Sequence, residues 1–160
     1  MTGQIRQSTG ERAQDSFVES PTRANKTAVE VYVGNASDIS GGGSNGNLEV
    51  ANAGQILSAL KCVYASSPNT VQYANNNIDF TSASVFGITI VAAQLNESTQ
   101  VQTYGVLRDS SFNWHSGAQL YLGTNGQITD TAPTSGFRTL VATSQGAGAI
   151  FINIQEPIIL

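Results

Sequence analysis

Short stretches in which hydrophobic and polar residues alternate run through most of this chain. The alternation is clear in 27–34 and in 149–155, where Ile150, Ile152 and Ile154 would share one face. A period of two residues is typical of a β-strand that buries one face, whereas a helix repeats its apolar positions about every three to four residues. Both segments are therefore predicted to be strands.

Other apolar stretches, bounded by Gly, Asn, Ser and Pro, predict more short strands. Within 48–67 the spacing of the apolar residues also fits a short helix, but a strand over 60–64 is favoured. Gly87 interrupts a later apolar run, which indicates a bulge or a close approach of another backbone. The additional predicted strands are 71–74, 85–93, 99–107 and 137–143.

The clearest turn lies in the stretch 105–137, which also contains the single tryptophan and the single histidine of the chain. Segments 119–122 and 127–131 flank the sequence Gly123-Thr124-Asn125-Gly126. An Asn-Gly pair between two such segments is a strong β-hairpin signal, because both residues tolerate a positive φ. A hairpin is therefore predicted here.

Short strands spaced roughly 8–12 residues apart, with turn residues between them, indicate an all-β fold. We expect a single domain over 27–160, built as a small antiparallel sandwich or barrel with an extended N-terminal arm. The Ser- and Gly-rich segment 40–47 is expected to be a flexible loop. The apolar end 157–160 is expected to pack on the core or at a subunit boundary.

Residues 1–26 are polar, with basic and acidic residues interleaved and few apolar side chains. Such a segment cannot bury enough surface to offset its ordering entropy, so it is predicted to be an extended arm. The arm would lie over its own domain or bind another subunit, and the second alternative is favoured. The contact residues expected in it are Arg6, Arg12, Phe17, Val18 and Arg23.

Charged residues make up only 11% of the chain, so neutral polar side chains must form most of its surface. Such a surface suits contact with other protein copies. The net charge is −4 and Lys61, Arg108 and Arg138 are the basic residues beyond 26, which argues against a nucleic-acid partner. No signal peptide and no apolar run of membrane-spanning length occurs, so no membrane partner is expected.

Residues that could carry catalysis are scarce. A Ser-His-Asp triad would have to use His115, and no Gly-x-Ser-x-Gly turn presents a serine. The single cysteine, Cys62, leaves a His and Cys metal site without enough ligands, and it is expected to be a small buried apolar residue of a protein folded in a reducing cytoplasm.

The acids of the globular part could form a pair for glycoside hydrolysis, but acids in such sequences more often stabilise turns. These acids are Asp79, Glu97, Asp109 and Asp130. No enzymatic activity and no cofactor are therefore expected.

Trp114 and Tyr121 allow two interpretations. Their rings could stack on a sugar or a partner surface, or Trp114 could close the core beside the hairpin, and the core interpretation is favoured. The residues expected in the core or in an oligomer contact are Trp114, Ile150, Ile152, Ile154, Ile158 and Leu160.

Several segments between about residues 50 and 160 carry a resemblance to a known family. They are Leu57–Ala65, Val85–Thr89, Gly105–Leu107, Asp109–Trp114, Leu120–Gly126, Pro133–Phe137 and Ile150–Leu160. These segments resemble the small β-domain found in structural proteins of tailed bacteriophages. Such domains occur at the ends of fibres and as capsid-decorating proteins, so the resemblance implies a virion protein and carries over no catalytic residues. Residues 1–49 lie outside it.

The chain begins with a polar arm, ends in the β-domain and has no fibre shaft. This layout favours a capsid decoration or cement protein whose arm binds neighbouring subunits of the major capsid protein. The alternative is a tail, neck or baseplate fibre component or a receptor-binding tip, and an enzyme acting on host polysaccharide is a further alternative. The neutral surface and the apolar segments 150–154 and 158–160 predict a homo-oligomer, and the resemblance implies that it is a trimer. The resemblance also implies a location in the virion after assembly in the host cytoplasm.

Overall fold

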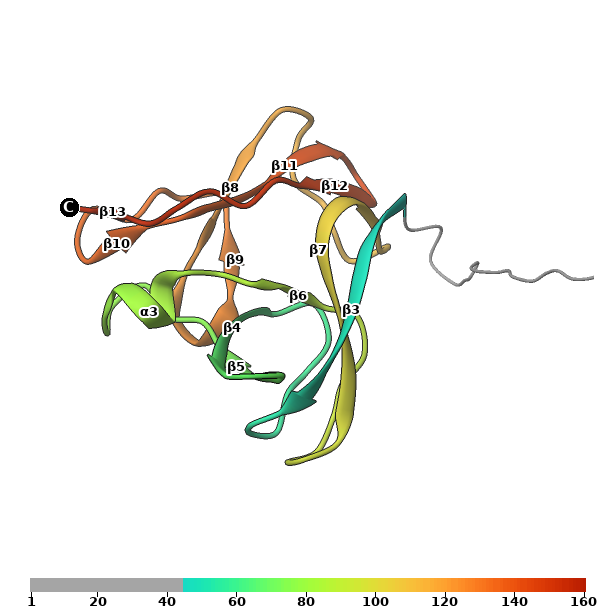
Figure 1. Ribbon diagram of the computed structural model, residues 1–160. Helices are drawn as coiled ribbons and strands as arrows, with labels where there is room; N and C mark the ends of the chain where they lie inside the picture. Colours follow the sequence, from blue (N-terminus) through green and yellow to red (C-terminus); the bar gives the residue numbers. More distant parts are fainter. Residues whose placement is uncertain (1–44) are drawn as a thin grey trace, which may run out of the picture. The chain divides into compact units, whose positions relative to one another are not determined.

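The computed structural model describes residues 45–160, which form an almost entirely β domain (Figure 1). Its strands are β3 (Asn45–Ala53), β4 (Cys62–Ser67), β5 (Thr70–Tyr73), β6 (Gly87–Thr89), β7 (Ser98–Arg108), β8 (Gln119–Leu122), β9 (Ile128–Thr129), β10 (Phe137–Arg138), β11 (Leu140–Gly146), β12 (Ala149–Ile152) and β13 (Ile158–Ile159). The helical turns of this part are α3 (Phe80–Ala83) and η4 (Thr124–Gly126). The predicted all-β fold class is confirmed. The predicted arm 1–26 and the predicted strand 27–34 lie outside the described residues.

The long strand β7 connects two branches of the fold. One of its edges pairs with β3 along almost its whole length. The other edge is divided, because Val101 and Gln102 pair with β6 whereas residues 105–108 pair with β12. The sheet therefore branches at β7, and this branching determines where the two cores lie.

The first branch closes on itself. β3 pairs with β5, β5 with β4, β4 with β6 and β6 with β7, which pairs again with β3. The β3–β5 pair is parallel, so the expectation of a purely antiparallel arrangement is wrong at this pair. A cluster of mostly small apolar side chains belongs to this ring: Ala51, Ala53, Leu57, Val63, Val71, Ala93 and Val101.

The second branch continues from β7 through β12, β11, β8 and β9, with every pair antiparallel. Ile150 and Ile152 of β12 are completely buried in a larger core. Leu120 and Leu122 of β8 belong to the same core, as does Cys62 from the ring. In Figure 1, β8, β11 and β12 lie on one side of this core and α3, β4 and β6 on the other. The domain thus combines a closed ring with a sandwich-like second layer.

A bulge in β7 lies where the two branches separate. The register between β7 and β3 shifts at Asn47 and Leu48. The side chain of Gln102 is completely buried beside the bulge, and its Nε2 donates hydrogen bonds to the carbonyl oxygens of Tyr104 at 3.1 Å and Val106 at 3.0 Å. Because buried carbonyl groups need donors, this side-chain amide stabilises the irregular part of the strand.

The predicted hairpin is confirmed. β8 and β9 are antiparallel, with Tyr121 opposite Thr129. Asn125 and Gly126 have φ values of 50° and 71°, the left-handed conformation that an Asn-Gly pair tolerates. The buried Gly126 donates its N–H to the carbonyl oxygen of Ala74 at 2.7 Å. The tip of the hairpin is therefore docked on the segment that follows β5.

The sequence does not indicate strand β3. Residues 45–47 fall in the expected flexible loop, and 48–53 show no clear alternation. In the structure this region nevertheless forms strand β3, and the side chains of Leu48 and Val50 are exposed. Pairing with the distant strand β7, rather than a local apolar pattern, holds this segment extended. The loop prediction is therefore wrong for 45–47.

Other predicted strands are shortened or divided. Only β6 is regular within 85–93, and the strand predicted at 149–155 ends with β12. The strand predicted at 137–143 divides into β10 and β11 at Thr139, whose buried hydroxyl donates to the carbonyl oxygen of Ala83 at 2.9 Å. This contact fixes the backbone between the two strands, and it depends on a residue far away in the sequence.

The region around 60–64 also differs in detail. Leu60 has a positive φ of 62°, so β4 begins only at Cys62, and it extends beyond the predicted strand to Ser67. The predictions at 71–74 and 99–107 are confirmed as β5 and β7. A Cβ at Gly87 would lie 2.6 Å from the backbone carbonyl oxygen of Gln102, which confirms the predicted close approach of another backbone.

Cys62 is buried completely in the larger core, which confirms its prediction as a buried apolar residue. Burial raises the pKa of its thiol to about 12, because the thiolate would lose its hydration, and the charge of Lys61 lowers the pKa only in part. The thiol therefore stays protonated at neutral pH, where it packs as a small hydrophobe.

Within residues 45–160, no helix is long and apolar enough to cross a membrane.

Candidate functional site

Three of the acids considered for hydrolysis stabilise local backbone. The carboxylate of Asp79 caps α3 and accepts a hydrogen bond from the N–H of Ser82 at 2.8 Å. Oε1 of Glu97 accepts from the N–H of Gln94 at 3.2 Å. Each acid therefore acts in the turn where it occurs, as acids in such sequences commonly do.

Asp109 stabilises a turn in the same way. Its Oδ1 accepts from the hydroxyl of Ser111 at 2.6 Å and from the N–H of Ser111 at 2.9 Å. Both hydrogen bonds lower the pKa of Asp109, because they stabilise its ionised form, and the hydrogen bond from the hydroxyl has the larger effect. Asp130 and His115 are exposed. In the described part of the chain, no three His, Cys, Asp or Glu side chains gather where they could hold a metal ion.

The residues predicted for the core or an oligomer contact fall into two groups. Ile150 and Ile152 are fully buried, and Ile154 is half-buried against the same core. Ile158 and Leu160 are exposed, so the C-terminal segment does not pack on the core of its own domain. The expectation that it packs on that core is wrong, whereas a subunit boundary stays a prediction. Arg6, Arg12, Phe17, Val18 and Arg23 lie outside the described residues.

The exposed C-terminal residues place apolar side chains on both faces of the two-stranded ribbon β10–β13, because neighbouring residues of a strand point to opposite faces. Ile158, Ile159 and Leu160 are 57%, 71% and 45% exposed. β13 pairs with β10, which places Ile159 opposite Phe137. The ring of Phe137 in turn meets the exposed Phe80 edge to face, with ring centroids 6.2 Å apart. We call these five residues the C-terminal apolar patch.

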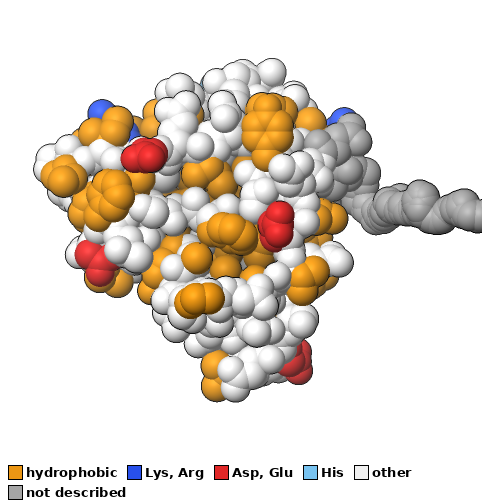
Figure 2. All heavy atoms as spheres, viewed as in Figure 1, with side chains coloured by type: hydrophobic (Ala, Val, Ile, Leu, Met, Phe, Trp, Pro, Cys, Tyr) orange, Lys and Arg blue, Asp and Glu red, His pale blue; other side chains and the backbone are white. Residues whose placement is uncertain are grey.

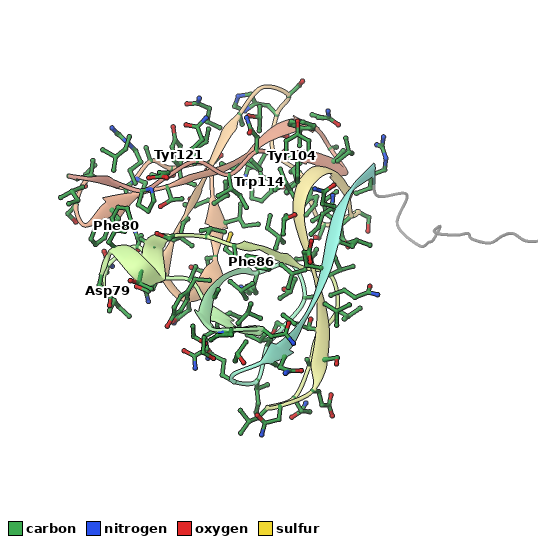
Figure 3. The ribbon with its side chains drawn as sticks, in the orientation of Figure 1. Asp79, Phe80, Phe86, Tyr104, Trp114 and Tyr121 are labelled. Carbon is green, nitrogen blue, oxygen red and sulfur yellow. The ribbon has the colours of Figure 1, made fainter. Side chains whose placement is uncertain are left out.

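Apolar side chains also appear on the face shown in Figure 2, over α3, β6 and neighbouring strands. Figure 3 labels Phe80, Phe86 and Tyr104 on this view, and all three are exposed. Tyr104 packs edge to face on Phe151 at 5.3 Å. Exposed apolar side chains that gather on one face mark surfaces that contact other proteins.

A second feature is an open groove of about 770 Å³, which we call the Trp114 groove. Most of its lining comes from the stretch 105–137, including the loop after β7 and the hairpin β8–β9. The residues before β4 and after β5 complete it. The polar and aromatic residues of its lining include Lys61, Asn76, Trp114, Gln127, Thr129 and Thr131.

Trp114 fits neither of the two predicted interpretations fully. It is half-buried and packs against the larger core, and its ring stacks on Phe112 at 5.7 Å with 27° between the planes. The same residue lines the groove. Tyr121 is half-buried and donates its hydroxyl to Oε1 of Gln119 at 2.9 Å. Trp114 is thus both a support of the core and a wall of the groove.

The groove could not be identified from the sequence. Asn76 is among its lining residues, although the polar run in which it occurs predicts only a turn. In the structure, the N–H of Asn76 donates to the carbonyl of Gly123 at 3.3 Å, and its carbonyl accepts from the N–H of Phe137 at 2.9 Å. These contacts join segments that are distant in sequence, so no local pattern could reveal them.

No protein-family model matches this sequence, and no curated protein matches it. Among solved structures, the chain shows a likeness to the head fibre gp8.5 N base of bacteriophage phi29, with 15% sequence identity and a TM-score of 0.39. The likeness covers 71% of this chain and 98% of that chain. A likeness this low does not establish a shared fold or a shared function.

Proposed function

We propose that this chain is a structural protein of a tailed-bacteriophage virion, and that it acts as a capsid decoration or cement protein. The arm 1–26 would bind neighbouring capsid subunits, and the β-domain would stand on the particle surface. The resemblance of 50–160 to phage β-domains supports this proposal. The local roles of Asp79, Glu97 and Asp109 in turns also fit a structural protein better than a hydrolase.

The C-terminal apolar patch is the observation that carries the proposal. It exposes three aliphatic residues at the end of the chain beside an exposed phenylalanine. Burying apolar surface is favourable by about 25 cal/mol per Å², so such a patch is stabilised when another protein covers it. We propose that a second copy of the chain covers the patch, which would give the homo-oligomer.

The Trp114 groove favours a second candidate function. That function is a receptor-binding tip, which would need a surface that recognises a molecule outside the virion. A groove with an aromatic wall and several polar side chains is suited to that task.

Removing the arm tests the proposed function. We expect that deleting Met1–Lys26 leaves a soluble, folded domain that no longer attaches to capsids assembled without the protein. The physical reason is that the arm supplies the proposed contacts with the capsid, so its deletion removes them while leaving the core of the β-domain intact. Occupancy is measured by co-sedimentation with capsids, and thermal unfolding checks the fold of the truncated protein.

A full-length variant with Arg6, Arg12 and Arg23 changed to Gln serves as a matched control, because it keeps the length of the arm. We expect it to attach more weakly than the wild type at low salt and to show a smaller change of occupancy as salt rises, because the charges that salt screens have been removed. Wild-type occupancy of the truncated protein would contradict the proposed role of the arm.

A further inference from the structure

We propose that the Trp114 groove binds an acidic saccharide. Its volume of about 770 Å³ lies in the range of small-molecule sites, and it could hold a short oligosaccharide. The virion role proposed above does not depend on this inference. The inference rests on an aromatic wall, an amide with an unsatisfied oxygen, and an uncompensated positive charge in the same groove.

Trp114 supplies the aromatic wall. Its ring is held by stacking on Phe112 and by packing against the larger core, so its orientation is fixed before a ligand enters. Because the side chain is only half-buried, part of it stays available on the side of the groove. The apolar C–H face of a sugar ring packs well on an indole, which offers a large flat surface at little cost in conformational entropy.

Asn76 supplies the amide. Only 8% of this residue is exposed, and its backbone is fixed by hydrogen bonds to Gly123 and Phe137. Its Oδ1 is buried and has no hydrogen-bond partner among the described residues. A buried polar atom without a partner is destabilising, so such atoms are rare in folded proteins. Because this oxygen has almost no accessible surface, a ligand hydroxyl would reach and satisfy it only after the Asn76 side chain rotates toward the groove.

The positive charge in the groove favours a saccharide that carries an anionic group. Lys61 is the charged residue of the lining, and neither Asp nor Glu lines the groove. Within the described residues, no carboxylate forms an ion pair with Lys61, so its ammonium group is available to an anion. Gln127, Thr129 and Thr131, with an amide and two hydroxyls, line the same groove. This set of donors and acceptors fits a sugar with hydroxyl groups and one carboxylate.

The single tryptophan of the chain makes the test direct, because the intrinsic tryptophan fluorescence reports on this groove alone. We expect 3′-sialyllactose, a trisaccharide with a single carboxylate used as the acidic probe, to change the Trp114 fluorescence with saturation at millimolar concentration or below. Maltotriose, a neutral probe of similar size, should bind about tenfold more weakly or not at all. Binding is measured on the full chain at low salt.

Three variants separate the contributions. Lys61→Gln should weaken the acidic probe about tenfold and leave the neutral probe unchanged, whereas Asn76→Ala should weaken both probes. Tyr104→Ala, which removes an exposed aromatic side chain outside the groove, should change neither. Thermal unfolding confirms that each variant is folded.

The inference is overturned if neither probe changes the fluorescence up to about 10 mM. It is also overturned if Lys61→Gln binds the acidic probe as well as the wild type does, or if Tyr104→Ala weakens binding as much as the groove variants do.

Discussion

Replacing Gly126 by alanine should lower the free energy of unfolding by about 2–4 kcal/mol. The glycine has a φ of 71°, a left-handed conformation that costs an alanine about 1 kcal/mol. A Cβ at this position would lie 2.5 Å from the carbonyl oxygen of Cys62 and 3.1 Å from Cδ1 of Tyr73. Relieving that contact requires a shift of the backbone of β4 or of the hairpin, which adds about 1–3 kcal/mol. Urea unfolding of both proteins measures the difference.

Gly117→Ala is the matched control. Gly117 also has a positive φ, of 87°, but a Cβ there would meet nothing within 4 Å. The Gly117→Ala substitution should therefore lower the free energy of unfolding only by the conformational strain, about 1 kcal/mol. Equal losses of unfolding free energy in the two variants would show that Gly126 does not lie against the carbonyl oxygen of Cys62 in β4.

Replacing Gln102 by glutamate should cost about 3–5 kcal/mol at pH 7. The completely buried amide donates to the carbonyls of Tyr104 and Val106, and a carboxylate in its place would have no proton to donate and no water around it. Burial and the facing carbonyl oxygens raise the pKa of the new carboxyl in the folded state above its unfolded value of about 4.3.

Because the new carboxyl has a higher pKa in the folded than in the unfolded state, the stability of the variant depends on pH. Below about pH 4 the carboxyl is protonated in both states, and one O–H can still donate, so the loss is smallest there. As the pH rises above about 4.3, the unfolded state releases the proton first, and the stability of the variant falls relative to the wild type. The exposed Gln100→Glu variant on the same strand should show little of this effect. A pH-independent loss in Gln102→Glu would contradict the described burial of the amide.

The features that the sequence predicts well are those decided within a few residues. The hairpin follows from Asn125 and Gly126, whose tolerance of positive φ is local chemistry. The strands β5 and β7 have apolar patterns of their own. The close approach at Gly87 also follows from one residue, because a glycine weakens a strand and is placed there mainly where a side chain would not fit.

The features that the sequence misses depend on contacts between distant segments. β3 is held by β7 although Leu48 and Val50 are exposed, so its pattern does not resemble that of a strand with one buried face. The break at Thr139 depends on its hydrogen bond to Ala83. The single turn α3 depends on a cap from Asp79, which in sequence is equally consistent with an ordinary turn.

The candidate sites show the same division. Trp114 can be identified as a candidate from the sequence because it is the only tryptophan. Its neighbours in the groove cannot, because they come from separate segments of the chain. Asn76 and Lys61 join it only because the hairpin tip docks on the segment after β5. The exposure of the C-terminal isoleucines could not be predicted either, because an apolar terminus can equally well pack on its own core.

The copy number of the protein in purified virions tests the proposed function most directly. Particles of the phage proposed to encode the chain are separated from free protein by density-gradient centrifugation, and the protein is quantified against the major capsid protein. A capsid decoration protein should remain bound in a fixed proportion, with hundreds of copies per particle. A few to a few tens of copies would instead indicate the tail or a fibre, and absence of the protein from the purified particles would contradict a structural role in the virion.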